Sequence, residues 1–398
     1  MNRRRFLKSS LAATGAALMG PAGPVFSKTT LDPDLAADCL KRWRKRILDS
    51  AKTRYCDEAA GEDIGWLMSP FLNGFYFGYK ATGEMEWVER FADWADSWSR
   101  RGVKDPDGFI GWPKRGEGIG QGNGLFMDSL LGEAMALRPI VLMAGEIHQA
   151  PALRERFGGR AQAWLDLAGR TFEKWNSFDC WREVKNGGLW VVPDFGIDPI
   201  TSRWTDGYAQ RATTGFSNPD NKQNLIARWL LAMHDVTGKS VYRDRAAQWF
   251  RLMKSRLRTQ DGGKYFVWNY WEPAGPWDYQ ANGEARHWIG VHPNGGYYAL
   301  DVEGIVAAYE HGLVFKHAAL LRLIATNRDF MWNQKMKGAQ FQRIDGGPPD
   351  PRWKNTPGVL WTALIPYDTR LREIFLQNFD PASWSGLSVT PWFLAREK

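Results

Sequence analysis

Apolar residues along this chain gather in paired segments whose two members differ in pattern. The first member of each pair is apolar nearly all round, and the second carries an apolar stripe at helical spacing with polar residues elsewhere. A helix that is apolar all round is buried on both sides, whereas a half-polar helix faces water. The pattern therefore predicts buried inner helices that alternate with outer ones. The expected inner helices cover 64–82, 123–143, 221–236 and 296–311.

Tight turns are predicted where the two members of a pair meet. Gly83 and Gly238 each end a helical pattern, and an aromatic residue follows four positions later, which is typical of a left-handed C-cap. Weaker versions of this joint occur at Gly145 and Gly312. A final short pair of helices is expected over 356–378.

The long connections all fall at the opposite end of the predicted pairs, and loops of such length in a compact domain are usually functional. Tight turns at one end and long loops at the other predict an all-α fold, an (α/α) toroid of about five to seven helical hairpins. An α-solenoid is the alternative, but it would show a more regular repeat. No linker interrupts the pattern, so 28–398 is expected to be one catalytic domain. The long connections are 103–122, 177–220, 259–295 and 335–355.

The N-terminal residues have the pattern of a targeting signal and are not expected to form part of the fold. Arg3 and Arg4 precede a Phe-Leu-Lys run, and a weakly apolar stretch leads to small residues around Ser27. This arrangement resembles the bacterial twin-arginine (Tat) signal, with 1–27 as the signal peptide. The resemblance implies a periplasmic or secreted protein with no stable membrane insertion after signal removal. The alternative is a disordered basic tail.

The charge of the mature chain is modest. The formal net charge is +8, and the signal contributes four of these charges and no acid. The remainder is not the footprint of a nucleic-acid binder, but it suits an acidic polysaccharide as the partner. Three cysteines without a CxxC motif argue against a disulfide framework, and one pair, Cys39 with Cys56, is left open. Six histidines without metal-ligand spacing predict neither a metal site nor a cofactor.

Tryptophan is unusually frequent, with 22 residues. An exported protein rich in Trp often stacks its indoles on the apolar faces of sugar rings, although core packing explains about half of them. The Trp residues of the long connections are therefore predicted to stack sugars. They are Trp112, Trp190, Trp268, Trp271 and Trp288.

Side-chain amides gather where the third expected inner helix begins. Asn218 precedes Pro219 and is more simply read as an N-cap, with substrate binding as the alternative. Asn221 and Asn224 are left to bind a substrate carboxylate beside free backbone N–H groups. Asn123, at the start of the second expected inner helix, is a further candidate for substrate binding.

A second junction, at the start of the last long inner helix, combines Arg286, His287, His292, Tyr297 and Tyr298. Elimination from a uronic acid needs these residue types together. Asn, Arg or His would neutralise the carboxylate and so acidify the neighbouring C5 proton, Tyr or His would remove that proton, and Tyr would protonate the departing oxygen. No metal is required.

Glycoside hydrolysis instead needs two opposed carboxylates. Acidic residues do occur near the predicted open end, but no two of them form a compelling pair in the sequence. They are Asp128, Asp220, Asp301 and Glu303.

The export signal, the toroid pattern and the Asn…His…Tyr order together resemble the α/α-toroid polysaccharide lyases that cleave alginate, glucuronan and related uronates, with polysaccharide lyase family 38 as the nearest match. The resemblance implies that Tyr298 is the catalytic tyrosine, with Tyr297 as the alternative. It implies that His292 or His287 handles a proton or neutralises charge. Asn221 or Asn224 would hold the carboxylate, helped by Arg286.

This assignment carries one expectation about a pKa, and two other functions compete with it. A neighbouring Arg286 or protonated histidine should lower the pKa of Tyr298 and favour its phenolate. The competing functions are a toroid glycoside hydrolase acting on unsaturated uronides and a non-catalytic periplasmic glycan-binding protein.

Overall fold

A computed structural model describes residues 31–397 apart from 106, 116–125, 193–214 and 353–355. The chain is mostly helical, with 61% helix and a few short strands, which agrees with the all-α fold class. Eleven α-helices occur in the part of the chain that the structure describes. They are α1 (Pro33–Ser50), α2 (Ser69–Thr82), α3 (Met85–Arg100), α4 (Leu130–Gln149), α5 (Pro151–Ser177), α6 (Asp220–Thr237), α7 (Ser240–Arg256), α8 (Gly295–Glu310), α9 (His317–Ala325), α10 (Thr369–Asn378) and α11 (Gly386–Glu397).

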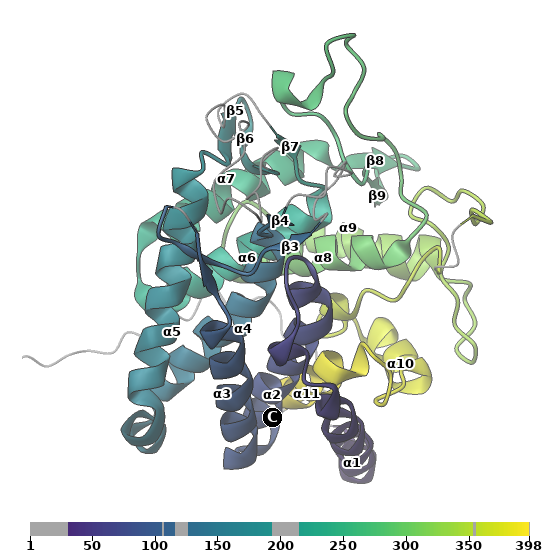
Figure 1. Ribbon diagram of the computed structural model, residues 1–398. Coiled ribbons are helices and arrows are strands. Elements are labelled where there is room, and N and C mark those ends of the chain that lie inside the picture. Colours follow the sequence, from purple (N-terminus) through teal and green to yellow (C-terminus); the bar gives the residue numbers. More distant parts are fainter. Residues whose placement is uncertain (1–30, 106, 116–125, 193–214, 353–355, 398) are drawn as a thin grey trace, which may run out of the picture.

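Helices with even numbers from α2 to α8 pack on one another in chain order, and α11 packs on α2 (Figure 1). Each helix with an odd number from α3 to α9 packs on the helix before it, and α1 packs on α11. The close approach of α6 and α8 depends on Gly304, because a Cβ there would lie 2.7 Å from Asn224 Cβ. The predicted alternation of inner and outer helices is thus present as a sequence of pairwise contacts.

The joints at Gly83 and Gly238 are confirmed, since both glycines cap their helices at φ 76° and 70°. The joint at Gly145 is wrong. There α4 continues to Gln149 without a break, and a Cβ on Gly145 would lie 2.8 Å from Val236 of α6. This glycine therefore serves helix packing.

Two helices that pattern reading missed, α1 and α11, complete the packing around α2. The last predicted pair is reduced to α10 and a single 3-10 turn, η7 (Thr362–Leu364). A π-helix, η3 (Ile64–Met68), leads into α2, and a second, η6 (Thr326–Met331), follows α9. The pairing of Cys39 with Cys56, which the sequence left open, does not form: both cysteines and Cys180 are free thiols.

The strands are short antiparallel pieces within the connections, and most lie toward the top of Figure 1. The largest sheet joins β5 (Trp181–Val184), β6 (Gly187–Val192) and β7 (Phe216–Ser217). The three remaining pairs are β1 (Val103–Lys104) with β2 (Ile110–Gly111), β3 (Lys114–Arg115) with β4 (Phe126–Met127), and β8 (Arg258–Gln260) with β9 (Tyr265–Val267). The strands shape the connections from which the candidate site is built.

Tryptophan fills the core to a greater extent than the sequence suggested. At least fifteen of the 22 Trp side chains are buried. Large rigid indoles pack against the inner helices: Trp43 of α1 and Trp87 of α3 meet at 4.7 Å between ring centroids beside Gly78 of α2. Trp43 also donates its N–H to the carbonyl of Leu387, which ties α1 to α11. Abundant tryptophan is therefore mainly a property of this core.

Candidate active site

Three segments that are distant in sequence meet at the N-terminal end of α6. The backbone N–H of Asp220 donates to the carbonyl of Tyr270 (3.1 Å), and the N–H of Tyr270 donates to Gly290 (2.8 Å). Lys222 forms an ion pair with Glu62, which lies just before η3. The start of α6, the connection after β9 and the connection before α8 are thereby held together.

An aromatic and histidine cluster forms where these segments meet. Tyr270 stacks on Tyr297 with ring centroids 5.2 Å apart, and His292 lies 4.7 Å from each of them. His287 lies 5.9 Å from Tyr270. Trp288 lies edge-on to His292 at 6.1 Å and is 49% exposed. The structure therefore brings both predicted histidines, Tyr297 and Trp288 together.

Asn221 is the most unusual polar group in this region. It is 1% exposed, and neither its Oδ1 nor its Nδ2 has a hydrogen-bond partner among the described residues. Leaving a buried donor or acceptor unpaired costs about 1–3 kcal/mol, so such groups are rare in folded proteins and usually have a role. The atoms are covered in this structure, so a ligand would reach them only after the covering side chains move.

Asn224, one turn later, has the opposite character. Its Nδ2 donates to Asp301 Oδ1 (2.7 Å), and its Oδ1 accepts from Trp249 Nε1 (2.9 Å). Trp268 Nε1 donates to the second oxygen of Asp301 (2.9 Å). Both polar atoms of Asn224 are therefore bonded within the core, and the residue is fully buried, so the structure does not present its amide to a substrate carboxylate.

The two histidines are held neutral. Burial lowers the pKa of His292 to about 4, and the neighbouring His287 and Arg343 act in the same direction. Burial and nearby Lys222 also lower the pKa of His287. His292 Nδ1 accepts from the backbone N–H of Asn294 (3.0 Å), so its neutral ring carries the proton on Nε2. His287 Nε2 is buried and has no hydrogen-bond partner within the described ranges of the chain.

Adjacent tyrosines occupy different environments. Tyr298 is 1% exposed, and its hydroxyl oxygen accepts from the backbone N–H of His292 (2.7 Å). Burial raises the pKa of Tyr298 well above its usual value, so the expectation of a lowered pKa is wrong. Tyr297 is half-buried and faces His292 and Tyr270. Tyr298 therefore fixes the 287–294 connection, and Tyr297 presents its ring to the cluster.

Arg286 is engaged by the protein itself. Its guanidinium donates to the carbonyls of Gly215 (2.9 Å) and Trp277 (3.3 Å) and lies 5.3 Å from the centroid of the Phe216 ring. These contacts tie the connection before α8 to β7. A role in holding a substrate carboxylate has no support in this geometry.

Four of the five predicted stacking tryptophans are core residues, which corrects the expectation that they face sugars. Trp112 stacks on Trp98 at 4.0 Å and donates to its carbonyl. Trp190, Trp268 and Trp271 are at most 2% exposed. The error arises because a residue in a long connection can still fold inward when its N–H finds a backbone or carboxylate acceptor. Only Trp288 of the five is open to solvent.

Asn218 does not cap α6, and this expectation is also corrected. Pro219 occupies the N-cap position, and no side chain caps the helix. Asn218 uses its backbone to bind Trp190 and Gln223, and its side chain lines a narrow cavity beside Glu62 and Asp128. Asn123 lies outside the described residues.

The acidic candidates for hydrolysis are held by partners. Asp220 pairs with Arg256, Glu303 pairs with Arg228, and Asp301 accepts from Asn224 and Trp268. Asp128 pairs with buried Lys174 (3.0 Å), which also binds Glu133, although Asp128 Oδ1 has no hydrogen-bond partner. No two of these carboxylates face each other across an open site in the part of the chain that the structure describes.

Sequence reading missed three residues of this site: Glu62, Lys222 and Tyr270. Tyr270 stands in a Trp-Asn-Tyr-Trp run, so its aromatic density was a usable signal. Burial is the largest of the causes that raise the pKa of Tyr270 far above its usual value, so its phenol stays a hydrogen-bond donor. The Lys222–Glu62 ion pair joins residues 160 positions apart and leaves no local signature.

Two features are absent from the described residues. No group of three or more His, Cys, Asp or Glu side chains is placed to hold a metal ion. No described helix combines the length and the apolar character needed to cross a membrane. Comparison with known proteins adds no relative: no protein-family model matches this sequence, and no curated protein matches it significantly.

Proposed function

We propose that this protein is a polysaccharide lyase that cleaves a uronic-acid polymer, of the alginate or glucuronan type, by β-elimination. The observation that carries the proposal is the buried, unpartnered amide of Asn221 at the same helix end as two neutral histidines and a stacked tyrosine pair. Neutral donors and a phenol are what the elimination needs, because they offset developing charge without a metal.

In this proposal Asn221 Nδ2 and the Nε2–H of His292 donate to the substrate carboxylate, and the protonated phenol of Tyr270 adds a third donor. Neutralising the carboxylate acidifies the C5 proton. Tyr297 or His287 takes that proton, the electron pair forms the C4–C5 double bond, and the bond from C4 to the glycosidic oxygen breaks. The departing oxygen takes a proton from Tyr297.

The fold and the export route belong to the same proposal. The chain-order packing of α2, α4, α6 and α8 and the contact of α11 with α2 support a toroid of helical hairpins. The candidate site lies at the end where the long connections gather, which is where such a fold would bind a polymer. The Arg3-Arg4 signal supports Tat export and work in the periplasm or outside the cell.

The pairing of the acidic residues favours elimination over hydrolysis. A hydrolase needs one carboxyl group as acid and a second as base or nucleophile across the scissile bond. Asp220 and Asp301 are at most 1% exposed and are occupied by buried partners. Asp128 and Asp220 each keep one oxygen without a hydrogen-bond partner among the described residues, but each is paired with a buried cation, Lys174 and Arg256 respectively.

The test is digestion of alginate, glucuronan, pectate, hyaluronan and a heparin-type polymer by the purified mature protein. Elimination creates an unsaturated uronate, which absorbs in the ultraviolet, together with a new reducing end. Absorbance and reducing ends that rise together support the lyase. Reducing ends without absorbance would establish a hydrolase, and tight binding without products would establish a glycan-binding protein.

A further inference from the structure

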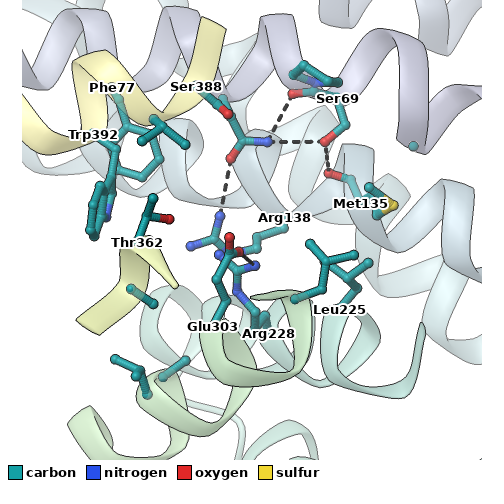
Figure 2. A pocket seen from close by; sticks show the side chains of 18 of the residues that line it. Ser69, Phe77, Met135, Arg138, Leu225, Arg228, Glu303, Thr362, Ser388 and Trp392 are labelled. Atoms are coloured by element: carbon teal, nitrogen blue, oxygen red, sulfur yellow. Dashed lines mark hydrogen bonds and ion pairs between the residues drawn. The ribbon is translucent and has the colours of Figure 1, made fainter. Parts of the chain in front are cut away.

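A cavity of about 300 Å³ lies between α2, α4, α6, α8 and α11, away from the histidine and tyrosine cluster (Figure 2). Its lining runs from Trp66 and Trp384, which precede α2 and α11, to Glu310 and Arg396 near the C-terminal ends of α8 and α11. The cavity thus follows the length of the inner helices. Its volume falls at the lower end of the range for small-molecule sites.

The charged groups that line the cavity do not balance. Three arginines and two glutamates face it, which leaves one excess positive charge. Arg228 pairs with Glu303, and Arg396 pairs with Glu310 (2.9 Å). Arg138 has no ion-pair partner among the described residues, so the excess charge resides on its guanidinium.

Arg138 is held in place by a defined chain of contacts. Its Nη1 donates to Asn73 Oδ1 (3.2 Å), and Asn73 donates to the backbone and hydroxyl oxygens of Ser69. Ser69 in turn donates to the carbonyl of Met135, one turn before Arg138 on the same helix. Figure 2 shows this chain and the guanidinium beside Arg228 and Glu303. A guanidinium has five N–H donors, and this one donates a single hydrogen bond to the part of the chain that the structure describes.

Burial is the largest cause that lowers the pKa of Arg138, and the nearby Arg228 acts in the same direction, whereas Glu303 and Glu310 act in the opposite one. The cavity walls add an apolar component, because the rings of Trp66, Phe77, Trp384 and Trp392 line it. A planar carboxylate matches a guanidinium in geometry and charge, and the aromatic walls suit a ring or alkyl body.

We propose that this cavity is a second ligand site, in which Arg138 binds the carboxylate of a small organic acid such as a free sugar acid. The site is independent of the proposed lyase activity, because Arg138 lies in the middle of α4 and no residue that lines the cavity takes part in the proposed elimination. One bound carboxylate would offset the single excess charge.

The test uses sodium glucuronate as the probe and glucose as its uncharged match, with binding measured by calorimetry on the full mature protein. Glucuronate should bind and raise Tm, since a ligand that binds only the folded state stabilises it. Glucose should bind at least about tenfold more weakly, because a charge-assisted bidentate contact is lost. Equal binding of the two sugars would overturn the proposal.

The variant Arg138→Met distinguishes binding in this cavity from binding at the candidate active site. It should abolish glucuronate binding and leave the Tm of the unliganded protein unchanged or higher, because it replaces a half-buried cation that has no ion-pair partner among the described residues by an apolar side chain of similar length. Arg154→Met, on the exposed face of α5, is the matched control and should bind as the parent does. Retained binding in Arg138→Met, with loss in Asn221→Leu, would place the acid at the candidate active site instead. A large fall in Tm without ligand would show that Arg138 serves stability.

Discussion

Among the described residues, the candidate active site holds buried polar groups without hydrogen-bond partners, whereas the cavity lined by Arg138 holds a cation without an ion-pair partner. At the start of α6 the unpartnered groups are neutral, an amide and an imidazole, and they sit on connections and a helix end. In the cavity the unpaired group is a cation, fixed from the middle of α4. Neutral groups can assist a reaction in which charge moves, whereas a fixed cation suits a ligand whose charge stays in place.

The contrast extends to residues that are neighbours in sequence. Asn221 and Asn224 are one turn apart on α6, and Tyr297 and Tyr298 are adjacent on α8. In each pair one member is bonded within the core, whereas of the other members Asn221 has no side-chain hydrogen-bond partner among the described residues and Tyr297 faces the cluster. Matched substitutions within a pair therefore separate a structural role from a functional one, because the chemical change is the same.

The largest effect is expected from the tyrosine pair. Tyr297→Phe should lower turnover on the uronate polymer at least about a hundredfold, the scale of a proton-transfer group, with the fold intact. Tyr298→Phe should lower turnover less than about tenfold, but it should destabilise the protein by about 1–2 kcal/mol because the N–H of His292 loses its acceptor. Initial rates and urea unfolding measure the two effects.

The reverse result would support Tyr298 as the catalytic tyrosine, which is the assignment that the family resemblance implies. A dead Tyr298→Phe enzyme with normal stability, beside an active Tyr297→Phe enzyme, would make Tyr298 catalytic in spite of its burial. If both variants kept full activity, His287 would be the remaining candidate for the proton transfer.

The asparagine pair gives the next largest effect, and here it is in stability. Asn224→Leu should cost about 2–3 kcal/mol, because Asp301 and the N–H of Trp249 would both lose a buried partner. Asn221→Leu removes groups that have no partner, so the free energy of unfolding should stay the same or rise, while turnover falls. Urea denaturation of both variants decides the point. An Asn221→Leu protein that is markedly less stable would mean that the amide binds something within the folded chain.

The sequence predicted what periodicity encodes and missed what depends on side-chain direction. The inner helices 64–82, 221–236 and 296–311 are present within a few residues, because burial on all sides leaves a continuous apolar pattern. Gly83 and Gly238 were readable because a left-handed cap is a local requirement. Gly145 was misread because the same residue type also permits close helix contact.

Within the site, the sequence located the segments but could not distinguish residues inside them. The adjacent Tyr297 and Tyr298 project in different directions from α8, and a helix phase uncertain by one residue exchanges their roles. Trp268 and Trp271 lie in a long connection and are nevertheless core, since Asp301 and the Ser217 carbonyl accept their N–H groups. Contacts across 33 and 54 positions leave no trace in a single sequence.

A smaller effect should appear in the pH dependence of stability. The pKa of His292 is about 4 in the folded protein and 6.5 in a free side chain, so between these values the unfolded state binds the proton and the folded state does not. The free energy of unfolding should therefore fall as pH drops from 6.5 toward 4. The contribution is on the order of 1–2 kcal/mol, below the full value of the shift because the ring is partly solvated.

Among the described residues, His292 faces the rings of Tyr270, Tyr297 and Trp288 and the charges of His287 and Arg343. The pKa of His287 is itself lowered by burial, so protonation of His287 also destabilises the folded state as the pH falls. Substituting His292→Gln should flatten the fall in stability, and adding His287→Gln should flatten it further. His234→Gln, at the far end of α6, controls for loss of an imidazole. Urea unfolding at a series of pH values gives the curves. Parallel curves for parent and His292→Gln would exclude a buried neutral His292.

The smallest effect compares an exposed tryptophan with a buried one. Trp288 is 49% exposed at the edge of the cluster, and Trp271 is fully buried with its N–H on the Ser217 carbonyl. Trp288→Ala should weaken polymer binding by about 1 kcal/mol, at the low end of aromatic stacking contacts, and change stability by less than about 0.5 kcal/mol. Trp271→Ala should instead cost about 3–5 kcal/mol of stability, as for other buried aromatic residues. The affinity of each variant for the polymer is measured on an inactive Tyr297→Phe background, and urea unfolding gives the change in stability. Unchanged affinity in Trp288→Ala would leave the described part of the chain without a stacking residue at this site, and the substrate would then be bound through its carboxylates alone.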